Sequence, residues 1–357
     1  MTASSRAAGV RCALMRGGTS KGALFLAEDL PTDRTERDAL LLRIMGSPDP
    51  RQIDGVGGAH PLTSKVGVVS VSADPEADVD YLFLQVVVDE PVVSDSQTCG
   101  NILAAAGAFA LERGLVTATG ETSDVRIRLV NTGGLATLRL QTPDGAVTYD
   151  GDAEVSGVPG TAAPVSIMVE PGSAPLLPTG NLVDELAGVA ATCIDNGMPS
   201  VIVRAGDLGV SGTEDPADLE ADDKLVARVR EIRAAAVAAM GLDPDLDATT
   251  VPKIVLVAEP HAGGSISTRS FIPVRVHQAV GVLGAASIAA AAVLPGTVAD
   301  GLAVRSAGDR VRVEHPTGFL DVEIAPGDGP DPVIARTAVV RTARMLFDGI
   351  VYPGPVR

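Results

Sequence analysis

The sequence predicts an α+β fold built from two pseudo-symmetric halves, each with mostly antiparallel strands wrapped around a central helix. Three observations predict it. The chain has 357 residues, more than the ~250–300 that a single core usually holds. It contains two Ala-rich, nearly uncharged segments of helical length, and β-branched runs with short polar turns surround them. We expect the halves at residues 1–180 and 181–357, with a last strand near 340–357 that packs back on the first half.

An approximate duplication predicts the similarity of the halves. Residues 17–30 (GGTSKGALFLAEDL) and 195–208 (DNGMPSVIVRAGDL) are each a Gly-containing turn followed by a β-rich run. Lys65 and Lys253 then each begin an apolar strand, and an Ala-rich segment follows in both halves. One such pairing is common by chance, but three in the same order indicate an internal repeat.

The two Ala-rich segments are expected to be the central helices. They read TCGNILAAAGAFALERGLV in the first half and HQAVGVLGAASIAAAAVLPGTV in the second, and stop signals close them at Gly114 and Pro295. A helix that is apolar all round is a buried one. The strands of each half are therefore expected to surround its helix.

Composition excludes several functions. The formal net charge is −17 and there are only nine aromatic residues, without tryptophan, which argues against a nucleic-acid partner. No segment reaches the ~20 apolar residues that span a bilayer, and the N-terminus has no secretory signal. The three cysteines and four histidines lack the spacing of a disulfide framework or a metal site. These features predict a reduced, cytoplasmic protein with no membrane partner and no metal.

Cys99 is the cysteine that the sequence places where a thiol could react. It precedes an Ala-rich helix, and the unpaired N–H groups of a helix N-terminus lower the pKa of a thiol. The alternative is a small core cysteine. Cys12 and Cys193 lie in strand-like contexts, and we expect both to be structural.

Cationic side chains gather at Gly-rich turns in a chain that is otherwise acidic. Lys65 opens an apolar strand, where it is either a solvated strand end or a desolvated general base. Arginine forks match carboxylates, so the cations suggest a small anionic substrate. The other members of this set are Arg16, Lys21, Arg269, Arg275 and His277, with Ser20 beside them.

Two glycine-rich segments resemble motifs that they do not complete. Gly18–Gly22 has the G-x-S-x-G spacing of a serine-hydrolase nucleophile elbow around Ser20, but a strand-like run follows it where the elbow requires a helix. Residues 55–58 (GVGG) lack the third glycine of a dinucleotide fingerprint. A serine hydrolase is therefore a distant alternative.

Several longer strings resemble the PrpF family. They are MRGGTSKG (15–22), RQIDGVGG (51–58), PLTSKV (61–66), CGNILAAAGAFALERGLV (99–116) and TRSFIPVRVH (268–277). The family consists of cofactor-independent isomerases with the diaminopimelate epimerase fold, and the resemblance runs through both halves. It therefore implies that fold and no cofactor.

The resemblance also implies roles for individual residues. Lys65 in LTSKV and Cys99 in CGN match the catalytic positions of the family. The related epimerases use one cysteine per half, but the second helix here begins HQAVG and offers no thiol, so a Lys/Cys proton shuttle fits better. The implied substrate contacts are Arg16, Ser20, Lys21, Gly100, Asn101, Arg269 and His277.

The implied reaction is proton transfer within an unsaturated keto tricarboxylic acid. The subgroup that the chain resembles most acts on 4-oxalomesaconate in bacterial protocatechuate and gallate breakdown, by keto–enol tautomerisation or 1,3-allylic isomerisation. A 2-methylaconitate cis–trans isomerase or a methylitaconate isomerase is the alternative within the same class. A non-catalytic polycarboxylate-binding protein is the alternative from a different class. We expect a small polycarboxylate as substrate and a homodimer as the assembly.

Overall fold

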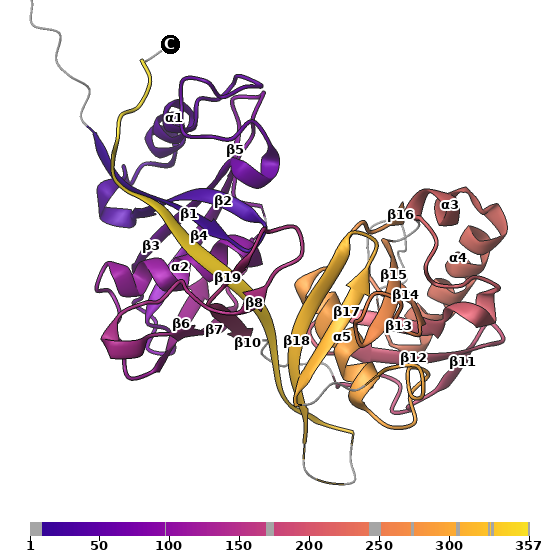
Figure 1. Cartoon of the computed structure of the whole chain (residues 1–357). Coiled ribbons are helices and arrows are strands. Elements are labelled where there is room, and N and C mark those ends of the chain that lie inside the picture. The colour runs from indigo at the N-terminus through magenta and orange to yellow at the C-terminus, as the bar shows by residue number, and fades with distance from the viewer. Residues whose placement is uncertain are drawn as a thin grey trace, which may run out of the picture. The chain divides into compact units, whose positions relative to one another are not determined.

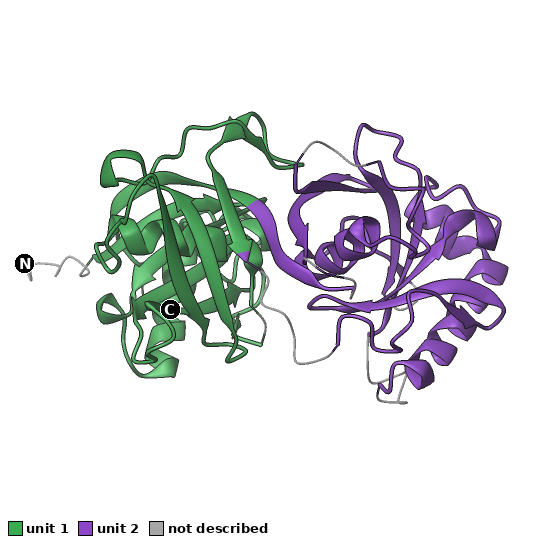
Figure 2. Ribbon diagram, turned by 90° about the horizontal axis from the view of Figure 1, so that it is seen from below, with its two compact units in different colours: residues 1–167, 341–357 green, residues 168–340 purple. Residues whose placement is uncertain are grey.

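The computed structural model divides the chain into two compact units, coloured in Figure 2. Unit 1 consists of residues 1–167 and 341–357, and unit 2 of residues 168–340. The structure describes residues 9–96, 98–168, 175–242, 251–272, 275–304, 308–327, 329 and 332–355.

Unit 1 is a closed ring of strands around one helix. The strands of the ring pair in the order β1-β2-β3-β4-β6-β7-β10-β19, and β19 pairs again with β1. Two of these pairs, β2–β3 and β4–β6, are parallel. The other pairs whose register is given are antiparallel. The ring strands are β1 (Val10–Gly17), β2 (Ser20–Leu26), β3 (Lys65–Val71), β4 (Val79–Val86), β6 (Thr122–Leu129), β7 (Leu135–Gln141), β10 (Pro164–Met168) and β19 (Ile334–Val351).

Helix α2 (Gly100–Glu112) fills the ring because its sequence leaves no polar face (Figure 1). The residues from Ile102 to Ala110 are all buried, and they form one core with the inward-facing side chains of the strands. A second core lies on the outer face of β2 and β3, against α1 (Arg34–Met45). Unit 1 also contains the short strands β5 (Val93–Ser94), β8 (Ala153–Glu154) and β9 (Thr161–Ala162) and the 3₁₀ turns η1 (Ala27–Asp29), η2 (Pro61–Thr63) and η3 (Pro143–Gly145).

Unit 2 repeats this plan around helix α5 (Val282–Val293). Its strands pair in the order β11-β12-β13-β14-β15-β17-β18, and β18 pairs with the beginning of β19. The parallel pairs are β13–β14 and β15–β17. The strands are β11 (Asp184–Leu186), β12 (Val189–Asp195), β13 (Pro199–Arg204), β14 (Lys253–Ala258), β15 (Ile266–Ile272), β16 (Arg275–Val276), β17 (Arg310–His315) and β18 (Gly318–Pro326).

Two helices cover the outer face of the unit 2 sheet. They are α3 (Pro216–Ala221) and α4 (Asp223–Ala239), and their apolar residues form a core with β12–β15 that is distinct from the core around α5. The 3₁₀ turn η4 (Ala205–Leu208) follows β13 as η1 follows β2.

The two units confirm the α+β class and the pseudo-symmetric halves expected from the sequence. In unit 1 the parallel pair β2–β3 sets Gly22 beside Lys65, and in unit 2 the parallel pair β13–β14 sets Ser200 beside Lys253. Both central helices are also shorter than their apolar segments: α5 begins only at Val282, after the β16 strand. No helix within the described ranges is long and apolar enough to cross a membrane.

Candidate active site

The first strands of unit 1 form a tight hairpin that carries the RGGTSKG string. β1 and β2 pair from Ala13↔Leu24 to Gly17↔Ser20, which leaves Gly18 and Thr19 as the turn. Gly18 has φ +49°, a conformation that favours glycine. Because Ser20 begins a strand, this segment does not form the strand–turn–helix elbow of a serine hydrolase.

The glycines of the hairpin let it press against the first turn of α2. A Cβ on Gly17 would lie 2.1 Å from the carbonyl oxygen of Asn101, and one on Gly18 would lie 2.2 Å from the Oδ1 of Asn101. A Cβ on Gly22 would lie 2.7 Å from the carbonyl oxygen of Lys65. The glycines therefore create the close packing that brings the hairpin, α2 and β3 together.

Asn101 ties the hairpin to the helix with both ends of its amide. Its Nδ2 donates to the hydroxyl of Thr19 at 3.0 Å and, at 3.4 Å, to that of Ser20, which is buried. Its Oδ1 accepts a hydrogen bond of 3.1 Å from the Nε of Arg341. These contacts give Asn101 and Ser20 a positioning role, and their predicted contact with substrate stays a prediction.

Arg16 also binds the turn and the last strand of unit 1. Its Nη1 donates to the carbonyl oxygen of Gly18 at 3.0 Å and to the carbonyl and hydroxyl oxygens of Thr342 at 3.1 and 2.9 Å. Burial and the nearby charge of Arg344 lower the pKa of Arg16. Lys21 lies opposite Arg16 in the β1–β2 ladder.

Cys99 is the N-cap residue of α2 and is half-buried. No side chain caps this helix end, and Gly100 is its first helical residue. The carbonyl oxygen of Cys99 accepts from the amide of Leu103 at 2.9 Å and from the hydroxyl of Tyr81 at 3.3 Å. The backbone of Cys99 is therefore fixed from two sides, while its side chain packs against the edge of the core around α2. An uncapped helix N-terminus favours an anion, either a thiolate or a carboxylate.

Lys65 lies at the start of β3 and is only 7% exposed. Alternation along β3 places its side chain on the same face as Val69, which belongs to the core around α2, whereas Val66 and Val68 face the outer core. Its Nζ donates to the Oε1 of Gln85 at 2.8 Å and lies 5.0 Å from the ring centre of Phe83. Lys65 and Cys99 are thus both attached to the inner core of unit 1.

Gln85 is a hydrogen-bond partner of Lys65 that sequence reasoning missed. It lies directly opposite Lys65 in the antiparallel β3–β4 ladder. Its Nε2 donates to the carbonyl oxygens of Ser64 and Pro61 at 2.9 and 3.1 Å. In the sequence it is one polar residue in a strand, and only the register of two strands reveals its partner.

The RQIDGVGG segment is a structural loop that supports Lys65 through Ser64. Gln52 is buried, donates to the hydroxyl of Ser64 at 2.7 Å and accepts from the amide of Ala59 at 2.9 Å. A Cβ on Gly57 would lie 2.2 Å from the Oε1 of Gln52. The glycine at this position therefore makes room for an amide side chain, not for a nucleotide.

In unit 2, Arg269 is buried on the outer face of β15. It lies on the same face of β15 as Phe271, two residues further on, which belongs to the core shared with α3 and α4. Its Nε donates to the carbonyl oxygen of Glu214 at 2.7 Å and its Nη1 to that of Thr268 at 2.9 Å. These contacts hold the segment before α3, and a contact between Arg269 and substrate stays a prediction.

His277 follows β16 and is half-buried. Its Nδ1 accepts from the amide of Ala279 at 3.0 Å, so its other ring nitrogen carries the proton of the neutral form. Burial and the positive charge of Lys253 lower the pKa of His277. Arg275, which completes the predicted cation set, is exposed on β16.

The other two cysteines are buried, and burial raises the pKa of each. The pKa of Cys12 rises to about 12, and that of Cys193 to about 12 as well, with Asp184 adding to the second shift. Neither thiol ionises readily, so both behave as small core residues. Within the described part of the chain, no three acidic, His or Cys side chains are grouped to hold a metal.

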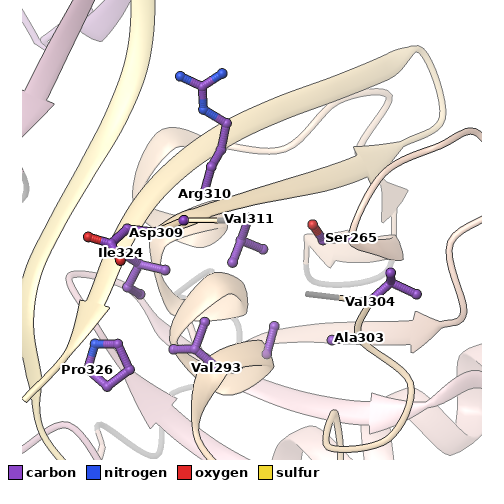
Figure 3. Close-up of a pocket in the computed structure, with 11 residues that line it drawn as sticks. Ser265, Val293, Ala303, Val304, Asp309, Arg310, Val311, Ile324 and Pro326 are labelled. Atoms are coloured by element: carbon purple, nitrogen blue, oxygen red, sulfur yellow. The ribbon is translucent and has the colours of Figure 1, made fainter. Parts of the chain in front are cut away.

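A small pocket of unit 2 contains none of the predicted residues (Figure 3). It offers about 40 Å³ between the end of α5 at Val293 and the start of β17 at Val311, space for a few water molecules only. Arg310 extends away from it. This pocket is too small and too apolar to receive a polycarboxylate.

The fold defines a class of protein, that of the two-halved, epimerase-like proteins in which strands surround a central helix in each half. A solved structure titled methylitaconate-delta-isomerase superposes with a TM-score of 0.85 at 34% identity, covering 98% of this chain and 96% of that one. The family model described as PrpF protein matches residues 8–354. The chain therefore belongs to the PrpF family.

Two curated relatives are each 52% identical to the chain. One is "(4E)-oxalomesaconate Delta-isomerase" of Novosphingobium sp., which matches over 347 residues, 96% of each chain. The other is "4-oxalomesaconate tautomerase" of Pseudomonas putida, which matches over 351 residues, 97% of this chain and 96% of the relative.

Proposed function

We propose that the chain is a cofactor-independent isomerase that moves a proton within 4-oxalomesaconate. The names of the two relatives that share 52% of their residues with it support this substrate. The observation that carries the reaction type is the pair of proton-exchanging groups on one core: the buried amine of Lys65 and the thiol of Cys99 at the uncapped end of α2.

The mechanism follows from the acidity of a carbon next to a conjugated keto acid. One of the two groups, Lys65 or Cys99, removes a proton from such a carbon and leaves a dienolate. The other group returns a proton at a second atom of the conjugated system, which shifts the double bond. Backbone N–H groups at the start of α2 stabilise the developing negative charge. Arg16 and Lys21 pair on the face of the hairpin that points away from the core around α2, so their predicted contact with carboxylates of the substrate stays a prediction.

Proton NMR of 4-oxalomesaconate with the enzyme in D₂O tests the proposal. Wild type should convert the substrate and incorporate deuterium at the exchanging carbon. Cys99→Ser should lower kcat by about 10²-fold or more, because a hydroxyl exchanges protons far less readily than a thiol. Cys193→Ser is the matched control, a thiol replacement in a strand core that should leave kcat unchanged. Equal kcat for Cys99→Ser and wild type would refute the shuttle.

A methylitaconate isomerase is the second candidate, supported by the solved structure at 34% identity. The two substrates are compared side by side by their kcat/KM. A higher value for methylitaconate would overturn the substrate assignment but keep the reaction class. A non-catalytic polycarboxylate-binding protein would bind both acids and exchange no deuterium.

The assembly and the cellular location are further parts of the proposal. We place the chain in the cytoplasm as a homodimer, and free thiols at all three cysteines are compatible with a reducing compartment. Light scattering measures the mass in solution, and cell fractionation with an antibody reports the location.

A further inference from the structure

We propose that Gln85 is the positioning residue of Lys65: it fixes the amine for proton transfer and, being uncharged, leaves the amine free to lose its proton. The inference rests on the proposed function, in which Lys65 exchanges a proton with the substrate. It begins from strand register, because residues directly opposite each other on antiparallel strands share one face of the sheet.

The amide of Gln85 can adopt only one of its two orientations. Its Nε2 donates to two backbone carbonyl oxygens, those of Ser64 and Pro61. The reverse orientation would set an oxygen against both carbonyls and an NH₂ group against the amine. The Oε1 therefore faces the Nζ of Lys65, where it accepts a hydrogen bond of 2.8 Å.

The two carbonyls that orient Gln85 are themselves held in place. Ser64 is fully buried, and its hydroxyl donates to the carbonyl oxygen of Val86 at 2.8 Å while accepting from Gln52. Pro61 begins η2, the short turn that leads into β3. The chain of contacts from Gln52 through Ser64 to Gln85 thus ends at the amine of Lys65.

The partners of Lys65 are all uncharged. They are the amide oxygen of Gln85 and the ring of Phe83, and no carboxylate within the described residues lies within ion-pair distance of the Nζ. A carboxylate there would favour the protonated amine strongly, whereas an amide oxygen or an aromatic ring favours it only weakly and still orients it. The titratable groups on the elements packed at this end are Lys21 on β2, Tyr81 on β4, Cys99 at the cap of α2 and His60 before η2.

Two substitutions separate orientation from charge. Gln85→Met keeps the length of the side chain but accepts no strong hydrogen bond, so kcat should fall by about 10–100-fold with KM changed by less than about threefold. Gln85→Glu places a carboxylate beside the amine and favours its protonated form, so the limb of the kcat/KM profile that reports the base should move to higher pH by about 1–3 units. Gln141→Glu, at the end of β7, is the control that adds the same charge elsewhere in unit 1.

A measurement that needs no substrate distinguishes a failure of this inference from a failure of the proposed function. The sequence has four lysines (Lys21, Lys65, Lys224 and Lys253), so the ¹³Cε signals of labelled enzyme are few, and Lys65→Arg identifies the signal of Lys65. A higher titration midpoint of that signal in Gln85→Glu, together with the kcat loss in Gln85→Met, supports the inference. An unchanged midpoint in Gln85→Glu, or wild-type kcat in Gln85→Met, overturns it. If wild type leaves 4-oxalomesaconate unconverted, the proposed function fails, and the titration still decides the role of Gln85.

Discussion

Lys65 of unit 1 and Lys253 of unit 2 occupy matching places in the repeat and differ in what surrounds them. Both begin a strand that runs parallel to the preceding one, and both share a face with residues of the core around the central helix. Lys65 has Gln85 opposite it in the β3–β4 ladder, whereas the β14–β15 ladder begins one residue after Lys253, at the pair Ile254↔Phe271.

The helix ends next to these lysines differ as well. Cys99 is the N-cap of α2, and Gly281 is the N-cap of α5. Burial and the positive charge of Arg233 lower the pKa of Lys253. Lys253 therefore lies near a second cation, whereas Lys65 is hydrogen-bonded to the neutral amide of Gln85. The repeat has kept the frame of strands and helix in both units. Among the described residues, an amide opposite the lysine and a thiol at the helix N-cap are found in unit 1, as Gln85 and Cys99.

The contact between the hairpin turn and the central helix also differs between the two units. In unit 1, Asn101 of the helix reaches out to Thr19 in the turn. In unit 2, Asn196 lies in the turn and contacts the helix. Its side-chain Nδ2 donates to the carbonyl oxygen of Ala286 at 3.1 Å, and its backbone N–H donates to the hydroxyl of Ser287 at 3.0 Å. An asparagine joins turn to helix in both units, but from opposite sides of the contact.

The largest expected difference is in kcat, between the alanine variants of the two lysines. Lys65→Ala should lower kcat by about 10³-fold, within the range that a positioned acid or base contributes. Lys253→Ala removes the same charge and the same number of atoms from unit 2 and should change kcat by less than tenfold. Steady-state kinetics with 4-oxalomesaconate measures both. Equal losses would mean that the units share the chemistry more evenly than their surroundings indicate.

A smaller difference, in stability, is expected between the two asparagines. Asn196 is buried, so Asn196→Ala should lower the free energy of unfolding by about 1–3 kcal/mol, because two buried hydrogen bonds of its Nδ2, to the carbonyl oxygen of Ala286 and the hydroxyl of Thr337, are lost. Asn101→Ala should cost less than about 1 kcal/mol, since its contact with Thr19 is exposed to water and those with Ser20 and Arg341 are only partly buried. Urea unfolding at pH 7 compares them. A larger cost for Asn101→Ala would reverse the assignment of the buried and exposed contacts.

The smallest expected difference concerns carboxylates and pH. Glu314 of unit 2 is 2% exposed; burial alone would raise its pKa, but the amides of His261, Gly264 and Ala262 outweigh burial and lower it. Its stabilisation is therefore present above its unfolded-state pKa of about 4.3 and is lost as the pH falls through the lower folded-state value. Glu314→Gln should lower the free energy of unfolding by about 1–3 kcal/mol at pH 7 and flatten its acid dependence.

Asp78 of unit 1 is the matched carboxylate for that experiment. Hydrogen bonds from Arg126 lower its pKa, but the arginine is half exposed to water. Asp78→Asn should cost less than about 1 kcal/mol at pH 7, as exposed ion pairs generally do. Denaturant unfolding between pH 3 and pH 7 compares the two variants, and equal pH slopes would contradict the distinction.

The sequence predicted the parts of this fold that patterns along the chain encode. Uncharged Ala-rich runs identify α2 and α5, because only a buried helix tolerates such a surface. Cys99 was predictable at a helix N-terminus because the helical run begins directly after it. The strings that resemble the PrpF family pointed to the family that the comparison confirms.

Features that depend on pairing between distant segments could not be predicted in this way. Gln85 meets Lys65 only through the β3–β4 register, which no local pattern specifies. Whether Arg269 faces the inner or the outer core depends on which side of the sheet α3 and α4 cover. The contact of Arg269 with Glu214 could therefore not be predicted from composition or from motifs. The sequence predicted Gly17 and Gly18 only as part of a turn at which cationic side chains gather, and the structure shows that these glycines also make room for Asn101.

Strand β19 has a consequence for how the protein is made. Its first residues pair with β18 in unit 2, and from Ala343 onward it pairs with β1 in unit 1. On the ribosome, the strand that closes the ring of unit 1 is therefore translated after the whole of unit 2. Until then β1 keeps an open edge, and Arg16 lacks its partner Thr342. The hairpin that carries RGGTSKG is thus synthesised before unit 2, yet it acquires its final contacts only when β19 is in place.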